Sequence, residues 1–362
     1  MRDMKRAAAV VLVASMAAMT VAGCSGKAEE TTAAATEAAA EAAGTETAEK
    51  EAAETEAAAE KTYRVAMCLS GAANDMGWCQ AAYEGLLSLE ENYGCEIAYT
   101  ENLTPDDIAG AFADYAANGY DVVIGHGYEF GDPAIEVAEM YPDVKFIVTE
   151  GEVEAENVAS YVTDCEEGGY VMGMLAAAMS ETGKVGYVGP IQGASLVKIM
   201  NGFEDGAKEV NPEIEVQTAW TGSFTDTALG KEAAQAMIDN GADVIGHCAN
   251  ESGNGCIAAA KEAGVYATGD SYDQNPLAPE TVLSSSVYHI SHVVELAFED
   301  VLDGSYAGGI YHFGMADDAV SIAPYHDLED KIPEEVKTMI DERVAAIKAG
   351  EFDVICDVAV RQ

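Results

Sequence analysis

The sequence predicts an α/β protein with two lobes, each an open parallel sheet covered by helices. From Tyr63 onward, short apolar runs alternate with longer amphipathic stretches, which is the pattern of βαβ units on a parallel sheet. This alternation restarts near Glu166, after a first series of similar length. About 300 residues follow the N-terminal region, more than one hydrophobic core usually supports. Together these observations predict two similar lobes with a ligand crevice between them.

The N-terminus reads as a processing signal. Arg2, Lys5 and Arg6 form a basic start, and the apolar run that follows, residues 7–22, is too short and too rich in Ala for a good membrane span. The run ends in Val-Ala-Gly-Cys24, which resembles a bacterial lipoprotein cleavage site. That resemblance implies a signal peptide over residues 1–23 and lipidation of Cys24. The alternative is an ordinary secretory signal with an incidental cysteine.

Residues 24–61 are expected to form a lipidated cysteine followed by a disordered tether. Residues 25–61 hold ten Glu and three Lys among Ala and Thr, with no aromatic or large aliphatic side chain. Such a segment cannot bury enough apolar surface to offset the entropy lost on ordering. Its expected role is to space a folded domain from a membrane.

The charge balance excludes several classes of partner. From Thr62 onward the chain has 53 acidic and 12 basic residues. A surface of that sign argues against binding DNA or RNA, and against an anionic ligand such as a nucleotide. The sequence has no G-x-x-x-x-G-K-[ST] loop, so the chain is not itself a P-loop ATPase.

The cysteines do not form a disulfide pattern. Seven follow Cys24, an odd number without paired spacing. Cys68 and Cys356 lie in apolar runs and are predicted to pack as small hydrophobes in strands. His247, Cys248 and Cys256 suggest a zinc site only weakly, because the usual closely spaced cysteine pairs are absent. His247 is expected instead to be a polar group at a strand end.

The first series of elements opens with a buried strand over Val65–Leu69 and a small turn. Asn74 or Asp75 caps the next helix, which has Ala82, Leu86 and Leu87 on its apolar face and Trp78 one turn in. The elements predicted after it are a strand near Glu96–Thr100, a helix over 105–118 capped by Thr104, a strand over Tyr120–Gly125, a helix over 133–141 and a strand over Val144–Thr149.

The second series begins with a long helix of small residues. Its predicted elements are a helix over Glu166–Ser180, strand Lys184–Gly189, helix Leu196–Val210, strand Glu213–Trp220, helix Thr227–Asn240, strand Ala242–Gly246, helix Cys256–Ala263, strand Val265–Thr268 and a C-terminal helix Pro333–Lys348.

One candidate site follows from the residues alone. The loop after the first strand of an open parallel sheet borders the ligand crevice. There Asp75 can accept from ring N–H groups, Asn74 can donate and accept, and Trp78 can stack on a planar neutral ligand. The competing interpretation is that Asn74 and Asp75 only cap a helix and that Trp78 is half-buried packing.

Four blocks in order resemble the basic membrane protein family. They are GHGYEFGDPAIEVAEMYPDVKFIV, EEGGYVMGMLAAAMSETGKVGYVG, GFEDGAKEVNPEIEV and NGADVI. Members are substrate-binding lipoproteins of ABC importers, including purine nucleoside receptors. The resemblance covers about residues 63–304 and implies a type I periplasmic-binding fold with a three-crossing hinge. With crossings near 162, 288 and 313, the N-terminal lobe is 62–162 plus 288–312 and the C-terminal lobe is 163–287 plus 313–362.

The resemblance also assigns ligand-binding residues. It implies that the purine base stacks between aromatic rings and bonds to Asn74 and Asp75, with Asp270 binding ribose hydroxyls. Where nucleoside receptors commonly carry a Lys that touches the ribose, this chain has Tyr288, so a free nucleobase is an alternative ligand. The other matched positions are Trp78, His126, Tyr128, Trp220, Phe224, Asp226 and Asn250.

The function implied is capture of a purine nucleoside or nucleobase and delivery to a permease driven by a separate ATPase. The chain would be a monomer without a cofactor, anchored by lipid on the extracytoplasmic face of the cell membrane. An enzyme is the main alternative of another class, but no G-x-S-x-G elbow appears. A surface sensor or adhesin, or a receptor for a sugar or other solute, remains open on the same fold.

Overall fold

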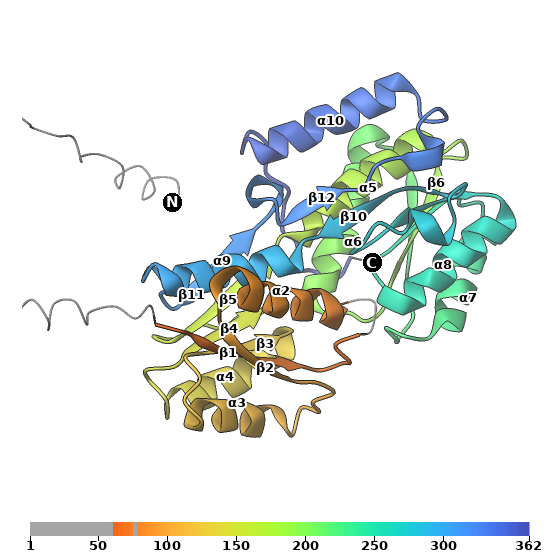
Figure 1. Cartoon of the computed structure of the whole chain (residues 1–362). Coiled ribbons are helices and arrows are strands. Elements are labelled where there is room, and N and C mark those ends of the chain that lie inside the picture. The colour runs from red at the N-terminus through yellow and green to blue at the C-terminus, as the bar shows by residue number, and fades with distance from the viewer. Residues whose placement is uncertain (1–60, 75–77, 362) are drawn as a thin grey trace, which may run out of the picture. The chain divides into compact units, whose positions relative to one another are not determined.

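The computed structural model describes residues 61–74 and 78–361. The signal, Cys24, most of the tether and Asp75 lie outside the described residues. Within the described part, the strands form two six-stranded sheets flanked by helices (Figure 1). The predicted fold class is therefore confirmed.

The first sheet is parallel throughout, with strand order β2-β1-β3-β4-β5-β11. Its strands are β1 (Arg64–Leu69), β2 (Glu96–Thr100), β3 (Val122–His126), β4 (Lys145–Thr149), β5 (Val158–Thr163) and β11 (Gly309–Phe313).

The second sheet repeats this order as β7-β6-β8-β9-β10-β12. It departs from the predicted parallel sheet at one edge, where β12 runs antiparallel to β10. Its strands are β6 (Lys184–Gly189), β7 (Glu215–Trp220), β8 (Val244–His247), β9 (Tyr266–Gly269), β10 (Val282–Tyr288) and β12 (Val320–Ile322).

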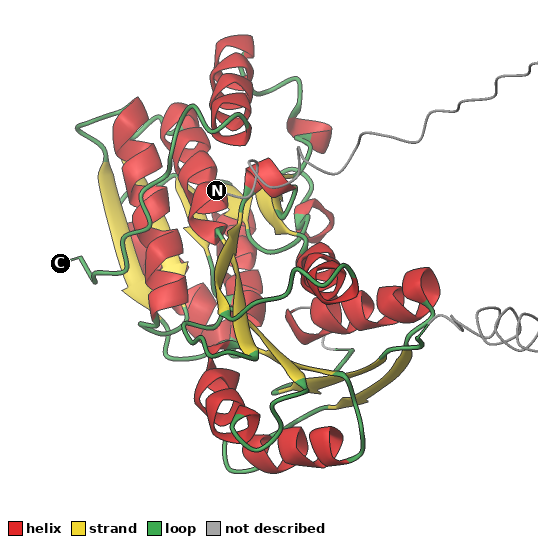
Figure 2. Cartoon of the chain, turned by 90° about the vertical axis from the view of Figure 1, so that its left-hand side faces the viewer, coloured by secondary structure: helices red, strands yellow, loops and turns green. Residues whose placement is uncertain are grey.

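Helices cover both faces of each sheet (Figures 1 and 2). On the first sheet, α2 packs with α9, and α3 packs with α4. On the second sheet, α5 packs with α6, and α7 packs with α8. Helix α10 lies on α5. Their bounds are α2 Trp78–Tyr93, α3 Ile108–Ala117, α4 Gly131–Ala138, α5 Cys165–Met179, α6 Ala194–Val210, α7 Thr227–Asp239, α8 Asn250–Ala263, α9 Ile290–Leu302 and α10 Glu334–Lys348. Short 3₁₀ helices are η2 Tyr128–Phe130, η3 Asn275–Leu277, η4 Met315–Asp317 and η5 His326–Leu328.

The alternation of side chains along a strand explains the layers. In β1, Met67 belongs to the buried cluster that includes α2 and α9, whereas Cys68 belongs to the cluster of α3 and α4. In β6, Tyr187 packs with α5 and α6 and Val188 with α7 and α8. Strands buried on both faces read as continuous apolar runs, which is why these strands were visible in the sequence.

One pair of equivalent strands, the third strand of each sheet, has a similar amino-acid sequence. The third strand of each sheet in chain order lies in the segment DVVIGH, ending at His126, or DVIGH, ending at His247. Each of these strands pairs with the first strand of its own sheet. Both histidines therefore lie at the carboxyl edge of a parallel sheet, and both are buried.

The chain passes between the sheets after β5, β10 and β11 within the described residues. The strands and helix at these passages, β5, α9, β11 and β12, were absent from the predicted elements. β5 and β11 are short edge-side strands whose apolar runs are interrupted by Ser160 and His312. Pattern alone does not separate such segments from loops.

Several local predictions are wrong. Leu87 is 38% exposed, because the buried face of α2 runs through Ala82 and Leu86 and turns Leu87 outward. Thr104 does not cap α3; its hydroxyl donates to Asp107 at 2.5 Å, and Asp107 occupies the N-cap position. Cys356 is exposed in an irregular segment and is not a strand residue.

Two boundaries near the predicted site also differ. The described part of α2 begins at Trp78, which was predicted one turn into the helix. The strand predicted over Ala242–Gly246 is β8, which ends at His247, and the predicted site residue Asn250 opens α8 with a φ of 49°. The helix predicted from Cys256 therefore begins six residues earlier.

Candidate functional site

The predicted site residues that the structure describes lie at or just beyond the carboxyl ends of strands. In open parallel sheets these ends border ligand sites. From the first sheet they are Asn74 after β1, Trp78 opening α2, His126 ending β3 and Tyr128 in η2; from the second they are Trp220 ending β7, Phe224 in the next loop, Asn250 opening α8, Asp270 after β9 and Tyr288 ending β10.

In the first sheet the structure brings Trp78 and His126 together. Their rings are stacked with centroids 4.3 Å apart and planes at 25°. His126 Nε2 donates to the backbone carbonyl of Trp78 at 3.1 Å, since a carbonyl can only accept. With this proton on Nε2, Nδ1 can accept from the Thr149 hydroxyl, which lies 2.7 Å away. Two hydrogen bonds and a stacked neighbour thus fix the His126 ring.

The exposure of these two rings differs. His126 has no exposed surface, whereas Trp78 is partly exposed. Of the two rings, only that of Trp78 offers surface to solvent. Thr149, at the end of β4, was not singled out in the sequence, because its role depends on the register that pairs it with His126.

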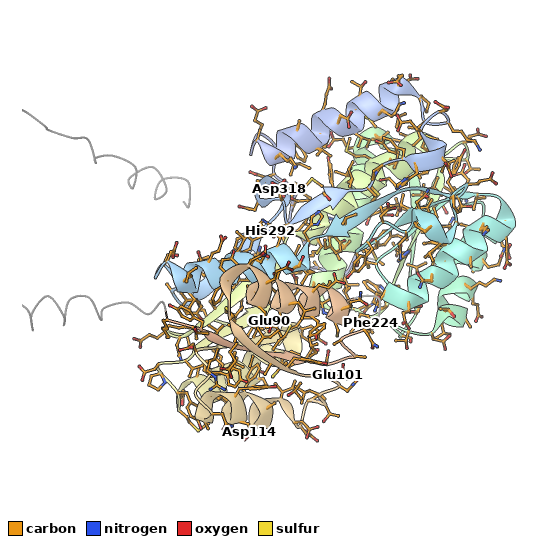
Figure 3. The ribbon with its side chains drawn as sticks, in the orientation of Figure 1. Glu90, Glu101, Asp114, Phe224, His292 and Asp318 are labelled. Carbon is orange, nitrogen blue, oxygen red and sulfur yellow. The ribbon has the colours of Figure 1, made fainter. Side chains whose placement is uncertain are left out.

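The loop before α2 is tied to the neighbouring strand. The Glu101 carboxylate, just past β2 (Figure 3), accepts from the backbone N–H of Ala73 at 2.7 Å. The next residue, Asn74, is exposed. Tyr128, in the loop after β3, is 58% exposed. Both side chains are accessible, and no contact joins them to the stacked pair among the described interactions.

In the second sheet the structure brings Asp270 and Tyr288 together. The Tyr288 hydroxyl donates to Asp270 Oδ1 at 2.6 Å, and the Ser271 hydroxyl donates to Oδ2 at 2.8 Å. Burial raises the pKa of Asp270 to about 6, although these hydrogen bonds lower it. Asp270 is thus a buried carboxylate whose two oxygens each already accept a hydrogen bond.

Gln274 connects this carboxylate to the strand-end histidine. Its Oε1 accepts from His247 Nε2 at 3.0 Å and from the backbone N–H of Asp270 at 3.0 Å. His247 Nδ1 accepts from the Ala249 N–H, and burial lowers the pKa of His247 to about 4, so the ring is neutral. A Cβ on Gly253 would lie 2.0 Å from His247 Nδ1, so a glycine lets α8 approach the ring. Nothing in the sequence around Gln274 marked it as a member of this network.

Trp220 and Phe224 supply the aromatic surface of the second sheet. Trp220 lies beside Gly189 at the end of β6, where an added Cβ would come within 2.4 Å of the indole. Phe224 is 39% exposed and lies near α7 and α8 (Figure 3). Its carbonyl accepts from Ser252 N in α8. The carboxylate of Asp226 caps α7 by accepting from two backbone N–H groups, which accounts for it structurally.

A buried charge cluster lies where the chain passes from β5 to α5. The Lys198 amine is 3.0 Å from Glu166 and donates to the Thr163 carbonyl at 2.8 Å. Burial would lower the pKa of Lys198, but Glu150 and Glu166 outweigh it and raise that pKa. Glu150 itself accepts from Thr163 N at 2.8 Å. A single Lys inside the apolar run of α6 was the only sequence signal for this cluster.

Within residues 61–74 and 78–361, no group of three or more His, Cys, Asp or Glu side chains is placed to hold a metal ion. No helix in that part of the chain is long and apolar enough to cross a bilayer.

A match to a family model shows which protein family the chain belongs to. Residues 62–354 match the model of the PnrA-like ABC transporter substrate-binding proteins, termed Bmp. The chain belongs to this family. Its members are substrate-binding proteins of ABC transporters, so a small-molecule substrate and a permease partner follow from membership, and the resemblance seen in the sequence is confirmed.

Relatives in this family carry different names. The transcriptional activator protein med of Bacillus subtilis is 32% identical over 75% of this chain and 85% of its own. A purine-binding protein of Brucella abortus is 31% identical over 82% and 83%. A protein of Haloferax volcanii, provisionally named as an ABC transporter glucose-binding protein, is 28% identical over 81% and 74%. Family membership therefore leaves the substrate of this PnrA-like chain to be determined.

Solved structures share the fold. A transcriptional activator of the comK gene from Bacillus halodurans matches with a TM-score of 0.71 and 28% identity, over 80% of this chain and 99% of its own. An ABC transporter solute-binding protein from Aeropyrum pernix also has a TM-score of 0.71, at 22% identity over 82% and 94%.

Proposed function

We propose that this PnrA-like protein captures a purine nucleoside or nucleobase outside the cytoplasm and delivers it to an ABC permease. The observation that carries the proposal is the pairing of an aromatic surface with buried polar groups at strand ends. Trp78 lies partly exposed on the first sheet, and Trp220 and Phe224 lie at the equivalent edge of the second. Flat rings suit a planar base, and aromatic stacking contributes about 1–3 kcal/mol per base. The purine-binding relative from Brucella abortus supports the same ligand class.

The proposed mechanism is capture by closure, without turnover. The N-terminal lobe comprises 62–162 plus 288–312, and the C-terminal lobe comprises 163–287 plus 313–362. The three passages of the chain between the sheets act as the hinge. Ligand binds at the strand ends of one lobe, and the other lobe closes over it. Closure makes each polar contact decisive, because a missing partner leaves a buried group unpaired.

The choice between nucleoside and free base depends on Asp270. Two ribose hydroxyls would have to donate to a carboxylate that already accepts from Tyr288 and Ser271. Each oxygen has a further acceptor position, so a ribose hydroxyl would have to donate beside these two donors. A free base needs no such contact. Asn74, Asp75, Tyr128 and Asn250 complete the proposed ligand contacts, with Asp75 outside the described residues and the buried His126 behind Trp78.

The proposed location follows from the N-terminal sequence. Lipidation of Cys24 would anchor the protein on the extracytoplasmic face of the membrane, and the tether of residues 25–61 would let the folded part reach the permease. The protein is proposed to act as a monomer.

A thermal-shift screen of bases, nucleosides, sugars and amino acids tests this function. A ligand at a hundred times its dissociation constant adds about 2.7 kcal/mol to the free energy of unfolding. A shift with purines supports the proposal, and comparison of adenine with adenosine separates base from nucleoside. A shift with glucose and none with any purine would replace the purine with a sugar, as the Haloferax volcanii relative's name suggests for that protein.

A further inference from the structure

We propose that His126 is a positioning residue that fixes the Trp78 ring as a one-sided stacking platform for the ligand. This inference rests on the proposed function and adds a residue that does not itself touch the ligand. It starts from the stacking of the two rings, 4.3 Å apart at 25°. His126 covers one face of the indole, so a ligand ring can stack only on the opposite face.

The contacts show why His126 can hold Trp78 in place. Nε2 donates to the Trp78 carbonyl, so the same histidine contacts both the backbone and the ring of one residue. The Thr149 hydroxyl orients the imidazole from its other side at 2.7 Å. Because β3 and β4 are paired at this position, Thr149 and His126 are held by the sheet itself. These contacts therefore fix the orientation of the Trp78 ring relative to the rigid sheet and not relative to the loop before α2.

The burial of the two rings supports a division of roles. His126 has no exposed surface, so it cannot contact a ligand without rearrangement. Trp78 is partly exposed and can. A platform fixed before binding loses less side-chain entropy when the ligand stacks on it.

The equivalent position of the second sheet provides a contrast. His247 is also buried at the end of its strand, but its Nε2 donates to Gln274, and no aromatic ring within residues 61–74 and 78–361 stacks on it. A histidine at this position therefore does not by itself imply a platform. What distinguishes His126 from His247 is its stacking with Trp78.

The test uses full-length protein labelled with 5-fluorotryptophan. The chain has two Trp, so two ¹⁹F resonances are expected, and Trp78→Phe assigns them. His126→Ala should shift and broaden the Trp78 resonance, leave that of Trp220 in place, and weaken the binding of adenine or adenosine about fivefold. His126→Phe keeps an aromatic ring and should restore much of the affinity and the resonance. A folded His126→Ala protein with an unmoved Trp78 resonance would overturn the proposal.

A gentler variant covers the case in which His126→Ala does not fold. Thr149→Val removes the hydroxyl that orients the imidazole and should shift the Trp78 resonance and weaken purine binding about threefold. Thr268→Val is the matched control, an equally buried threonine in the second sheet, and should change neither readout. No response to Thr149→Val, or an equal response to Thr268→Val, contradicts the proposal. If wild-type protein binds no purine, the proposed function fails, while the ¹⁹F shifts still decide whether His126 holds Trp78.

Discussion

Replacing Tyr288 by Phe is the sharpest probe of the buried carboxylate. The change keeps the ring packing but removes the hydroxyl that donates to Asp270 Oδ1 at 2.6 Å. A hydrogen bond to a charged group contributes about 1.5–3 kcal/mol, and the remaining donor, Ser271, cannot satisfy the lost position. At pH 8, where Asp270 is ionised, we expect the free energy of unfolding to fall by about 2 kcal/mol, which lowers the melting temperature by about 3 °C for a folded part of this size.

The expected loss depends on pH. Because burial raises the folded pKa of Asp270 from 3.8 to about 6, its ionisation opposes folding. The stability gained from protonating Asp270 is fully present below about pH 4 and is lost as the pH rises through about 6. Removing the Tyr288 donor raises that folded pKa further, so the variant is penalised most above pH 6. At pH 4.5, where Asp270 is largely neutral, we expect a loss of about 1 kcal/mol or less.

The measurement is urea unfolding of wild type and Tyr288→Phe at pH 8 and pH 4.5. The matched control is Tyr306→Phe, since the Tyr306 hydroxyl donates at 2.7 Å to the neutral carbonyl of Phe146. The control should lose about 1 kcal/mol equally at both pH values. An equal loss for Tyr288→Phe at both pH values would refute the view that Tyr288 stabilises a charged carboxylate.

Three further predictions concern the ligand, the anchor and the passage between the sheets. Trp78→Ala should weaken purine binding about tenfold by calorimetry, a loss of about 1–3 kcal/mol; unchanged affinity would make Trp78 a packing residue. Cys24→Ser should release the protein into the medium or leave it unprocessed on fractionation, and retention at the mature size would contradict lipidation. Lys198→Met leaves Glu166 buried without its cation and should cost about 3–5 kcal/mol in urea unfolding. The control Lys231→Met breaks an exposed ion pair and should lower the free energy of unfolding by about 1 kcal/mol or less. Equal losses for the two variants would contradict the view that burial makes the Lys198 ion pair costly to break.

The sequence predicted the layers of the fold because its strands are buried on both faces. The runs at β1, β3, β4 and β6 are continuously apolar, and the amphipathic stretches between them have helical length. The strands that the sequence did not predict are those whose formation depends on the strand they pair with. β12 is three residues long and exists because β10 offers it an antiparallel edge. Cys356 follows an apolar run in a segment where no strand forms.

For the site, the positions of residues could be predicted from the sequence, but their contacts could not. Strand-end residues such as His126 and Asp270 could be located because parallel strands end at a common edge. The contact of His126 with Trp78 could not, since it depends on the register of β3 with β4 and on where α2 begins. The same holds for the bond between Tyr288 and Asp270, which lie 18 residues apart. The roles of the predicted residues in ligand binding remain predictions.

The repeated histidine has different partners in the two sheets, so under the proposed function each sheet would supply a different half of one site. His126 and His247 end equivalent strands, are both buried, and both donate through Nε2. In the first sheet the acceptor belongs to Trp78, so this position supports an aromatic face. In the second the acceptor is Gln274, which also accepts from the backbone of Asp270, so the position supports a carboxylate. Under the proposed function, the first lobe offers the face of Trp78, and the second offers the polar contacts near Asp270 beside its own rings, Trp220 and Phe224. A ligand with a flat face and polar edges therefore gains its full binding free energy only when both lobes engage it, which couples its chemistry to closure.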